Sequence, residues 1–115
     1  MRAALDSEVV VIADRSGVIR FWSAGAERAF GYPATRAVGE TLDLIVPPEH
    51  RDAHWNGFRR AVEASSAGLE GEATPFPVRC ADGVVREAMG RLTLARRPAG
   101  RVAAVIVAFD TAAAP

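Results

Sequence analysis

The chain has 115 residues, half of them hydrophobic, with 14 basic and 14 acidic side chains and no net charge. This length fits one compact domain. The balanced charge argues against nucleic acid or an anionic membrane as a partner, because phosphate binding normally requires a basic surplus. The single cysteine, Cys80, excludes an intramolecular disulfide. Residues 1–8 lack the apolar core of a signal peptide, and no apolar run approaches the ~20 residues of a membrane helix. We therefore predict a cytoplasmic protein.

The N-terminal part of the chain has the pattern of a β-hairpin. Residues 8–13 are mostly β-branched and apolar, which indicates a buried strand. Residues 14–17, Asp-Arg-Ser-Gly, read as a turn in which Gly17 is free to adopt a positive φ. Residues 18–22 then return as a second apolar strand.

Two short helices are expected next. Ser23 caps the first, because a serine hydroxyl accepts hydrogen bonds from the free N–H groups of a first helical turn. This helix runs through Phe30, and Gly31-Tyr32-Pro33 stops it. The second helix covers residues 34–38. The segment 41–46 is apolar and either helical or extended.

The longest helix is predicted to begin at Pro47-Pro48 and to run to about Ala64. Proline is favoured in the first turn of a helix, where the N–H group that it lacks has no intrahelical partner. The helical period places His54, Phe58 and Ala61 on one face. We expect this face to point toward the interior of the domain.

Three strands follow, at about residues 71–80, 84–95 and 101–109. Pro75 and Pro77 lie in the first of them and cannot donate to a neighbouring strand, which predicts an edge strand or a bulge. Two strands, several short helices, one long helix and three strands make an α+β domain. We expect its five strands to form one antiparallel sheet.

This order of elements resembles a PAS domain, and short motifs agree with it along nearly the whole chain. They are IADRSGVI at residues 12–19, AERAFGY at 26–32, VG at 38–39, DG at 82–83 and FDT at 109–111. Each motif is weak alone, but together they have the order and spacing of the family. The resemblance implies one PAS domain over residues 1–115, with its core at about 8–111. Trp22 is a departure, because PAS domains usually place asparagine there; the tryptophan would reshape the entrance to the helical segment or fill part of the pocket.

A narrower resemblance concerns the long helix. Most PAS domains are sensory or interaction modules whose small cavity holds a cofactor, a metabolite or nothing, so the fold alone assigns no function. The sequence PEHRDAH at residues 48–54 is similar to the motif that opens this helix in the haem-PAS oxygen sensors of rhizobial histidine kinases. The last histidine of that motif is the proximal iron ligand. The resemblance therefore implies b-type haem held by His54, with Arg60 contacting a haem propionate.

The distal side departs from those sensors. They place an arginine on the first strand after the helix, where it donates a hydrogen bond to bound oxygen, and this chain has Thr74 there. Threonine can donate one hydrogen bond but carries no charge. The aliphatic distal positions correspond to Leu69, Gly90 and Leu92, and Gly90 would leave extra distal space.

Aromatic side chains are the remaining candidates for cofactor walls, although in a small domain they usually belong to the core or an interface. The candidates are Trp22, Trp55, Phe58 and Phe76. Phe58 lies one turn after His54 and is the best placed to touch a ligand. Trp55 points roughly 100° away from His54 on the helix, so it could instead pack against a partner subunit.

Other residues have less specific alternatives. His54 could be a partly buried histidine that donates to a backbone carbonyl. His50 and His54 have the i, i+4 spacing of a zinc pair, but no glutamate or cysteine is evidently placed to complete the site. Cys80 lies late in a strand, whereas flavin-binding light sensors of this fold carry their cysteine in a short helix. Met89 would be a sixth iron ligand only if it faced the pocket, and strand alternation places it opposite Gly90 and Leu92.

The resemblance implies a haem sensor of a diatomic gas or of redox state that signals through a homodimer or a partner protein. No catalytic triad, paired carboxylate site or phosphate loop is visible, so we predict no enzyme. Two alternatives stay open. One is a cofactor-free interaction module whose outer sheet face mediates dimerisation, and the other is a sensor of a small organic ligand. The colour of the purified protein separates haem from both.

Overall fold

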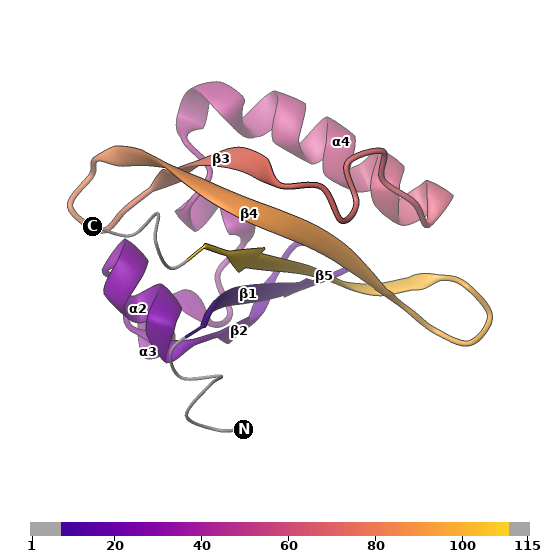
Figure 1. The fold of residues 1–115 in the computed structure, drawn as a ribbon, viewed down its shortest axis with the longest axis horizontal. Coiled ribbons are helices and arrows are strands. Elements are labelled where there is room, and N and C mark those ends of the chain that lie inside the picture. Colours follow the sequence, from indigo (N-terminus) through magenta and orange to yellow (C-terminus); the bar gives the residue numbers. More distant parts are fainter. Residues whose placement is uncertain (1–7, 111–115) are drawn as a thin grey trace.

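The computed structural model describes residues 8–110, which form one five-stranded antiparallel sheet with the order β2-β1-β5-β4-β3 (Figure 1). This confirms the predicted α+β class. Residues 1–7 and Thr111, the last residue of the FDT motif, lie outside the described residues. The strands are β1 (Val9–Asp14), β2 (Ile19–Trp22), β3 (Thr74–Arg79), β4 (Val85–Arg96) and β5 (Val102–Phe109). The helices are α2 (Ala24–Phe30), α3 (Ala34–Ala37) and α4 (Arg51–Ala64), with 3-10 turns η1 (Leu42–Leu44) and η2 (Pro48–His50).

The helices lie against two different parts of the sheet (Figure 1). α2 contacts β1 and α3 contacts β2, whereas α4 lies on the side of β3 and β4. Within residues 8–110, no helix combines the length and the apolar character that crossing a membrane requires.

The turn of the β1–β2 hairpin is held by Asp14. Its Oδ1 accepts hydrogen bonds from the N–H groups of Ser16 and Val18 at 2.9 and 3.1 Å, and its Oδ2 accepts one from Arg20 Nε at 2.8 Å. Gly17 adopts the expected positive φ, +85°. The predicted hairpin is therefore present, with a turn fixed by one carboxylate.

Ser23 connects this hairpin to α2. Its hydroxyl oxygen accepts from Ala26 N at 3.0 Å, as the predicted helix cap does, and also from Val10 N of β1 at 2.9 Å. The same hydroxyl donates to the carbonyl of Glu8 at 2.7 Å. One buried side chain thus caps α2 and joins it to the sheet.

The long helix differs from the prediction at its start. The residues after Pro47 form the 3-10 turn η2, in which His50 N donates to Pro47 O at 2.9 Å, and the α-helix begins only at Arg51. A 3-10 turn, whose hydrogen bonds join residues three apart, is a frequent start of an α-helix, and proline fits there because the N–H groups of a first turn have no intrahelical partner. α4 ends at Ala64, as predicted, and Ser65 follows it with a left-handed φ of 55°.

β3 lies at the sheet edge, as its prolines predicted. Pro75 and Pro77 pair in register with Met89 and Glu87 of β4. Alternate N–H groups along a strand point in opposite directions, so the proline nitrogens face the open edge, where no strand needs a donor. Arg79, two residues after Pro77, confirms this direction because its N–H donates to Ile45 O, outside the sheet, at 2.8 Å.

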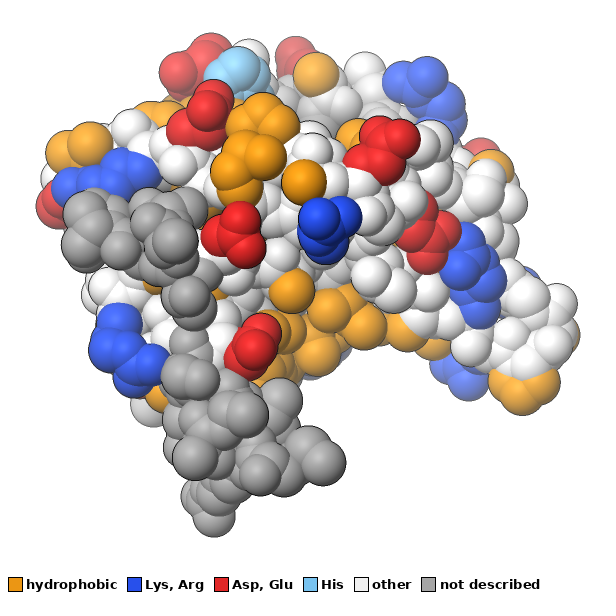
Figure 2. All heavy atoms as spheres, in the orientation of Figure 1, with side chains coloured by type: hydrophobic (Ala, Val, Ile, Leu, Met, Phe, Trp, Pro, Cys, Tyr) orange, Lys and Arg blue, Asp and Glu red, His pale blue; other side chains and the backbone are white. Residues whose placement is uncertain are grey.

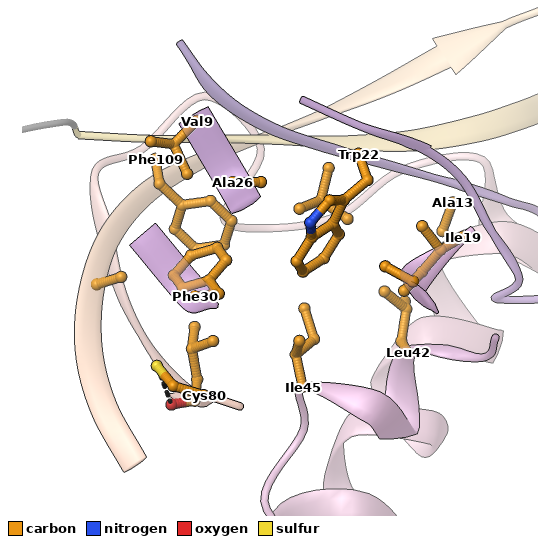
Figure 3. Close-up of a cluster of buried hydrophobic side chains, with 14 residues drawn as sticks. Val9, Ala13, Ile19, Trp22, Ala26, Phe30, Leu42, Ile45, Cys80 and Phe109 are labelled. Atoms are coloured by element: carbon orange, nitrogen blue, oxygen red, sulfur yellow. Dashed lines mark hydrogen bonds between the residues drawn. The ribbon is translucent and has the colours of Figure 1, made fainter. Parts of the chain in front are cut away.

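The main core lies between α2, α3, η1 and the inner face of the sheet (Figure 3). Trp22 is 4% exposed, packs with Phe30 and Tyr32, and donates from Nε1 to the Tyr32 carbonyl at 2.8 Å. Trp22 thus belongs to the main core, which is the ordinary role of an aromatic side chain in a small domain. A second, smaller core lies under the C-terminal half of α4 and consists of Val62, Leu94, Val102 and Val105.

Candidate ligand-binding site

Two apolar cavities meet at the inward face of α4. The inner cavity, about 370 Å³, lies between the start of α4, η1 and the inner faces of β1, β3 and β5. The outer cavity, about 520 Å³, lies between the C-terminal half of α4, residues 66–69 and strands β4 and β5. Both have the size of small-molecule pockets. The wall that they share is formed by Ala53, His54, Phe58, Phe76, Leu92 and Val105.

His54 is the polar residue of this shared wall. Its ring lies 4.8 Å from that of Trp55 and 5.8 Å from that of Phe58, measured between centroids. Its Nδ1 is buried and has no hydrogen-bond partner among the described residues. Leaving such an atom unsatisfied costs roughly 1–3 kcal/mol, so the site lacks one polar partner for this ring.

The protonation state of His54 follows from its surroundings. Burial lowers the pKa of the imidazole below its ordinary value, and the negative charge of Asp43 offsets only part of this effect. The ring is therefore neutral at neutral pH. A neutral imidazole offers a nitrogen lone pair, which is the form that binds a metal.

Most of the predicted site residues surround these cavities. Phe58, Phe76 and Leu92 line both cavities beside His54. Arg60 and Leu69 line the outer cavity, and both are exposed, so they lie at its rim. Side chains on the inward face of α4 and on the inner face of β4 thus line the same cavities.

Thr74 and Gly90 do not behave as the distal prediction assumed. Thr74 lines neither cavity, and its hydroxyl donates to the Glu72 carbonyl at 3.0 Å. A Cβ built on Gly90 would come within 3.0–3.2 Å of Phe109, Val107 and Phe76 side chains. Neighbouring apolar side chains therefore fill the extra space that Gly90 was expected to leave.

The alternative ligands have distinct positions. His50 lines the inner cavity but is exposed. Residues 8–110 contain no group of three or more His, Cys, Asp or Glu residues that could hold a metal ion, so the i, i+4 spacing of His50 and His54 has no further ligands beside it. Met89 alternates with Gly90 and lines neither cavity. Cys80 is buried outside both cavities, with its Sγ 3.8 Å from Val78 O.

Sequence reasoning missed the role of Trp55. The helical period predicts that Trp55 lies off the inward face, against a partner subunit, yet its ring packs against Gly17 and its Nε1 donates to Asp43 Oδ1 at 2.7 Å. The sequence gives no local signal of this contact, because Trp55 and Gly17 are 38 positions apart in the chain (55 minus 17).

The family of the chain follows from comparison with known proteins. Residues 5–113 match the family described as the PAS fold. The chain belongs to the PAS family. The order of elements and the motifs at residues 12–19 and 26–32 had implied this family.

Two curated relatives are sensor proteins. The chain is 26% identical over 73 residues to the oxygen sensor protein DosP of Escherichia coli, which involves 64% of this chain and 9% of DosP. It is 24% identical over 86 residues to the sensor protein FixL of Bradyrhizobium diazoefficiens, which involves 66% of this chain and 17% of FixL. The chain thus spans less than a fifth of the length of either relative.

Solved structures agree on the fold. The PAS domain of a Colwellia psychrerythraea protein has a TM-score of 0.78 at 17% identity, with 94% of this chain and 90% of that chain covered. The PAS domain of the quorum-sensing receptor RpfR from Cronobacter turicensis, in complex with C12:0, has a TM-score of 0.69 at 16% identity, with 90% and 91% covered. At these identities the likeness establishes the PAS fold alone.

Proposed function

We propose that this PAS domain is a sensor module that binds haem b, with His54 as the iron ligand. The observation that carries the proposal is a neutral imidazole whose buried Nδ1 lacks a partner, in the wall shared by two apolar cavities. Imidazole is a common haem ligand. The similarity of residues 48–54 to haem-PAS sensors and the match to an oxygen sensor support the same proposal.

The side chains around His54 suit this group. Phe58, Phe76 and Leu92 provide apolar walls that exclude water on both sides of the histidine. Arg60 stands at the rim of the outer cavity, where its guanidinium is available to a carboxylate such as a propionate. Haem, when bound, supplies an iron centre that takes up a diatomic gas or changes redox state.

The sheet side of the pocket favours a signal that needs no hydrogen-bond donor. Thr74 is engaged with Glu72, and the side chains packed over Gly90 are apolar. The polarity and the donors of a distal pocket decide whether oxygen is held. We therefore propose carbon monoxide, nitric oxide or redox state as the signal, rather than stably bound oxygen.

Absorption spectroscopy tests the haem proposal. Apoprotein titrated with haemin should give a sharp Soret band at one equivalent. His54→Ala should lose or shift this band, because the iron loses its protein ligand. His50→Ala is the matched control, since it removes the exposed histidine one turn earlier and should leave the band unchanged. A free-haemin spectrum in the wild type, or an unchanged band in His54→Ala, would contradict the proposal.

A second candidate function is the sensing of an amphiphilic organic acid. The two cavities share Phe58 and Phe76 as lining residues, and Arg60 stands at the outer rim, an arrangement that suits an apolar tail with a carboxylate head. RpfR, a structural neighbour, was solved with C12:0. Dodecanoate should then raise the melting temperature of the apoprotein, and Arg60→Ala should reduce this shift. An unchanged melting temperature would eliminate this candidate.

The outer face of the sheet is where we propose that the module signals, through a second copy of the chain. Ile12 pairs in register with Phe21 on β2 and with Ile106 on β5, so three apolar side chains form a row across this face. Figure 2 shows hydrophobic side chains gathered in a hollow over β1 and β5, surrounded by charges of both signs. Contiguous exposed apolar surface of this kind marks an interaction site.

A further inference from the structure

Trp55 connects the pocket to the opposite end of the sheet. It follows His54 in α4, and the two rings meet edge to face, with centroids 4.8 Å apart and planes at 75°. It also contacts Phe58, the next aromatic wall of the pocket, at 5.4 Å. Edge-to-face aromatic pairs hold a preferred relative orientation, so the position of the Trp55 ring restricts that of the His54 ring.

Asp43 fixes the indole. Its Oδ1 accepts from Trp55 Nε1 at 2.7 Å, a charge-assisted hydrogen bond. Arg51 reinforces the contact: its guanidinium donates to the carbonyls of Asp43 and Val46 at 3.1 and 3.2 Å and lies 3.7 Å from the Asp43 carboxylate. η1 is therefore attached to the start of α4 by two side chains of that helix.

The far side of the indole rests on the β1–β2 turn. A Cβ built on Gly17 would lie 2.3 Å from two carbons of the Trp55 ring, a distance that forces one of the two to move. The turn is also bound to η1, since Leu42 N donates to Gly17 O at 3.0 Å. Glycine is thus required at this position by its neighbour as well as by its positive φ of +85°.

We propose that Gly17, Trp55 and Asp43 are positioning residues that set the orientation of His54 and couple the pocket to the β1–β2 turn. The coupling itself consists of contacts within the chain and requires no ligand. Its use in sensing rests on the proposed ligand role of His54. A change at the β1–β2 turn that displaces Trp55 should therefore alter the position of the His54 ring. A ligand bound at His54 should in the same way alter the contact of Trp55 with the turn.

The test uses the two histidines of the chain, whose ring Cε1–H signals are separable by proton NMR of the apoprotein and assignable with His54→Ala. Gly17→Ala should move the His54 signal, because the new methyl group displaces Trp55. Gly83→Ala is the matched control: its φ is +83°, so the backbone strain is the same, but nothing lies within 4 Å of the added Cβ. It should leave the His54 signal in place.

A second pair of variants covers the case in which Gly17→Ala does not fold. Trp55→Phe removes the N–H donor to Asp43 and should move the His54 signal. Trp22→Phe removes the indole donor of the second tryptophan, which is bound to Tyr32 O at 2.8 Å, and should not move the His54 signal. The proposal is overturned if each test variant moves the signal no more than its control.

Haem release gives the functional readout. In haemin-loaded protein, Gly17→Ala should accelerate loss of haem to an excess of scavenging protein by about tenfold relative to Gly83→Ala, the effect of one displaced contact. Equal rates would refute the coupling to ligand binding. If the wild type takes up no haem, the proposed function fails, and the histidine signals of the apoprotein still decide the positioning proposal.

Discussion

His54 owes its properties to the residues that enclose it. Apolar walls on both cavities exclude the water that would otherwise solvate a charged ring, and the carboxylate of Asp43 accepts from Trp55 Nε1. The sequence indicated the inward direction of this side chain from the helical period. It did not indicate that Nδ1 lacks a hydrogen-bond partner, because the cavity walls around His54 include residues of β3, β4 and β5 that are distant in the sequence.

The depressed pKa of His54 predicts a pH dependence of stability. The unfolded chain takes up a proton near the ordinary histidine pKa of about 6.5, whereas the native ring resists it until lower pH. Stability is thus fully present above this value and is lost as pH falls below it. Urea unfolding from pH 7.5 to 5.5 should show this decline in the wild type and in His50→Gln. It should be weaker in His54→Gln, and an equal decline in both variants would refute the assignment.

Ser23 should dominate the stability of the hairpin–helix junction. Ser23→Ala leaves the buried N–H group of Ala26 and the half-buried N–H group of Val10 without their acceptor, at a cost of roughly 2 kcal/mol. Thr41→Ala is the control, because Thr41 caps only η1 through an exposed bond of 3.3 Å to Asp43 N and should cost less than about 1 kcal/mol. Equal losses in urea melts would contradict the double role of Ser23.

At the scale of elements, the sequence located most of the helices and strands because their apolar periods are clear. Alternation along β4 correctly placed Gly90 and Met89 on opposite faces, and the prolines correctly placed β3 at the edge. The predicted start of the long helix was wrong, because two consecutive prolines are compatible with either an α-helical turn or a 3-10 turn. Alternation gives the face of a residue and not what packs on it, so the filling of the space at Gly90 was not foreseen.

Gly90→Val tests how tightly the strands close the inner cavity. The new side chain meets Phe109, Val107 and Phe76 at 3.0–3.2 Å already at its Cβ, so overpacking should cost about 1–3 kcal/mol in thermal or urea unfolding. Thr93→Val places the same side chain on an exposed position of the opposite face of β4 and should change stability little. Comparable effects of both substitutions would mean that Gly90 borders open space.

At the scale of the molecule, the order and spacing of several short motifs were sufficient to indicate a PAS domain, and the family match over residues 5–113 confirms it. The cavities could not be predicted, since their walls combine side chains from α4 and three or more strands that are distant in sequence. The contact of Trp55 with the β1–β2 turn escaped prediction for the same reason.

The apolar row on the outer sheet face predicts self-association of the whole domain. Ile106→Glu places a carboxylate at the β5 end of this row and should convert a dimer into a monomer in sedimentation velocity experiments. Val84→Glu, at an exposed apolar residue of the β3–β4 turn, should leave the dimer intact. A wild-type monomer at high micromolar concentration would refute the homodimer.

The most direct test of the central claim is the Soret spectrum of haemin-loaded His54→Ala before and after addition of imidazole. If His54 is the iron ligand, the variant should show an altered band, and free imidazole should restore the wild-type spectrum by entering the space that the side chain has left. A wild-type spectrum without imidazole, or a free-haemin spectrum in the wild type itself, would contradict haem ligation by His54.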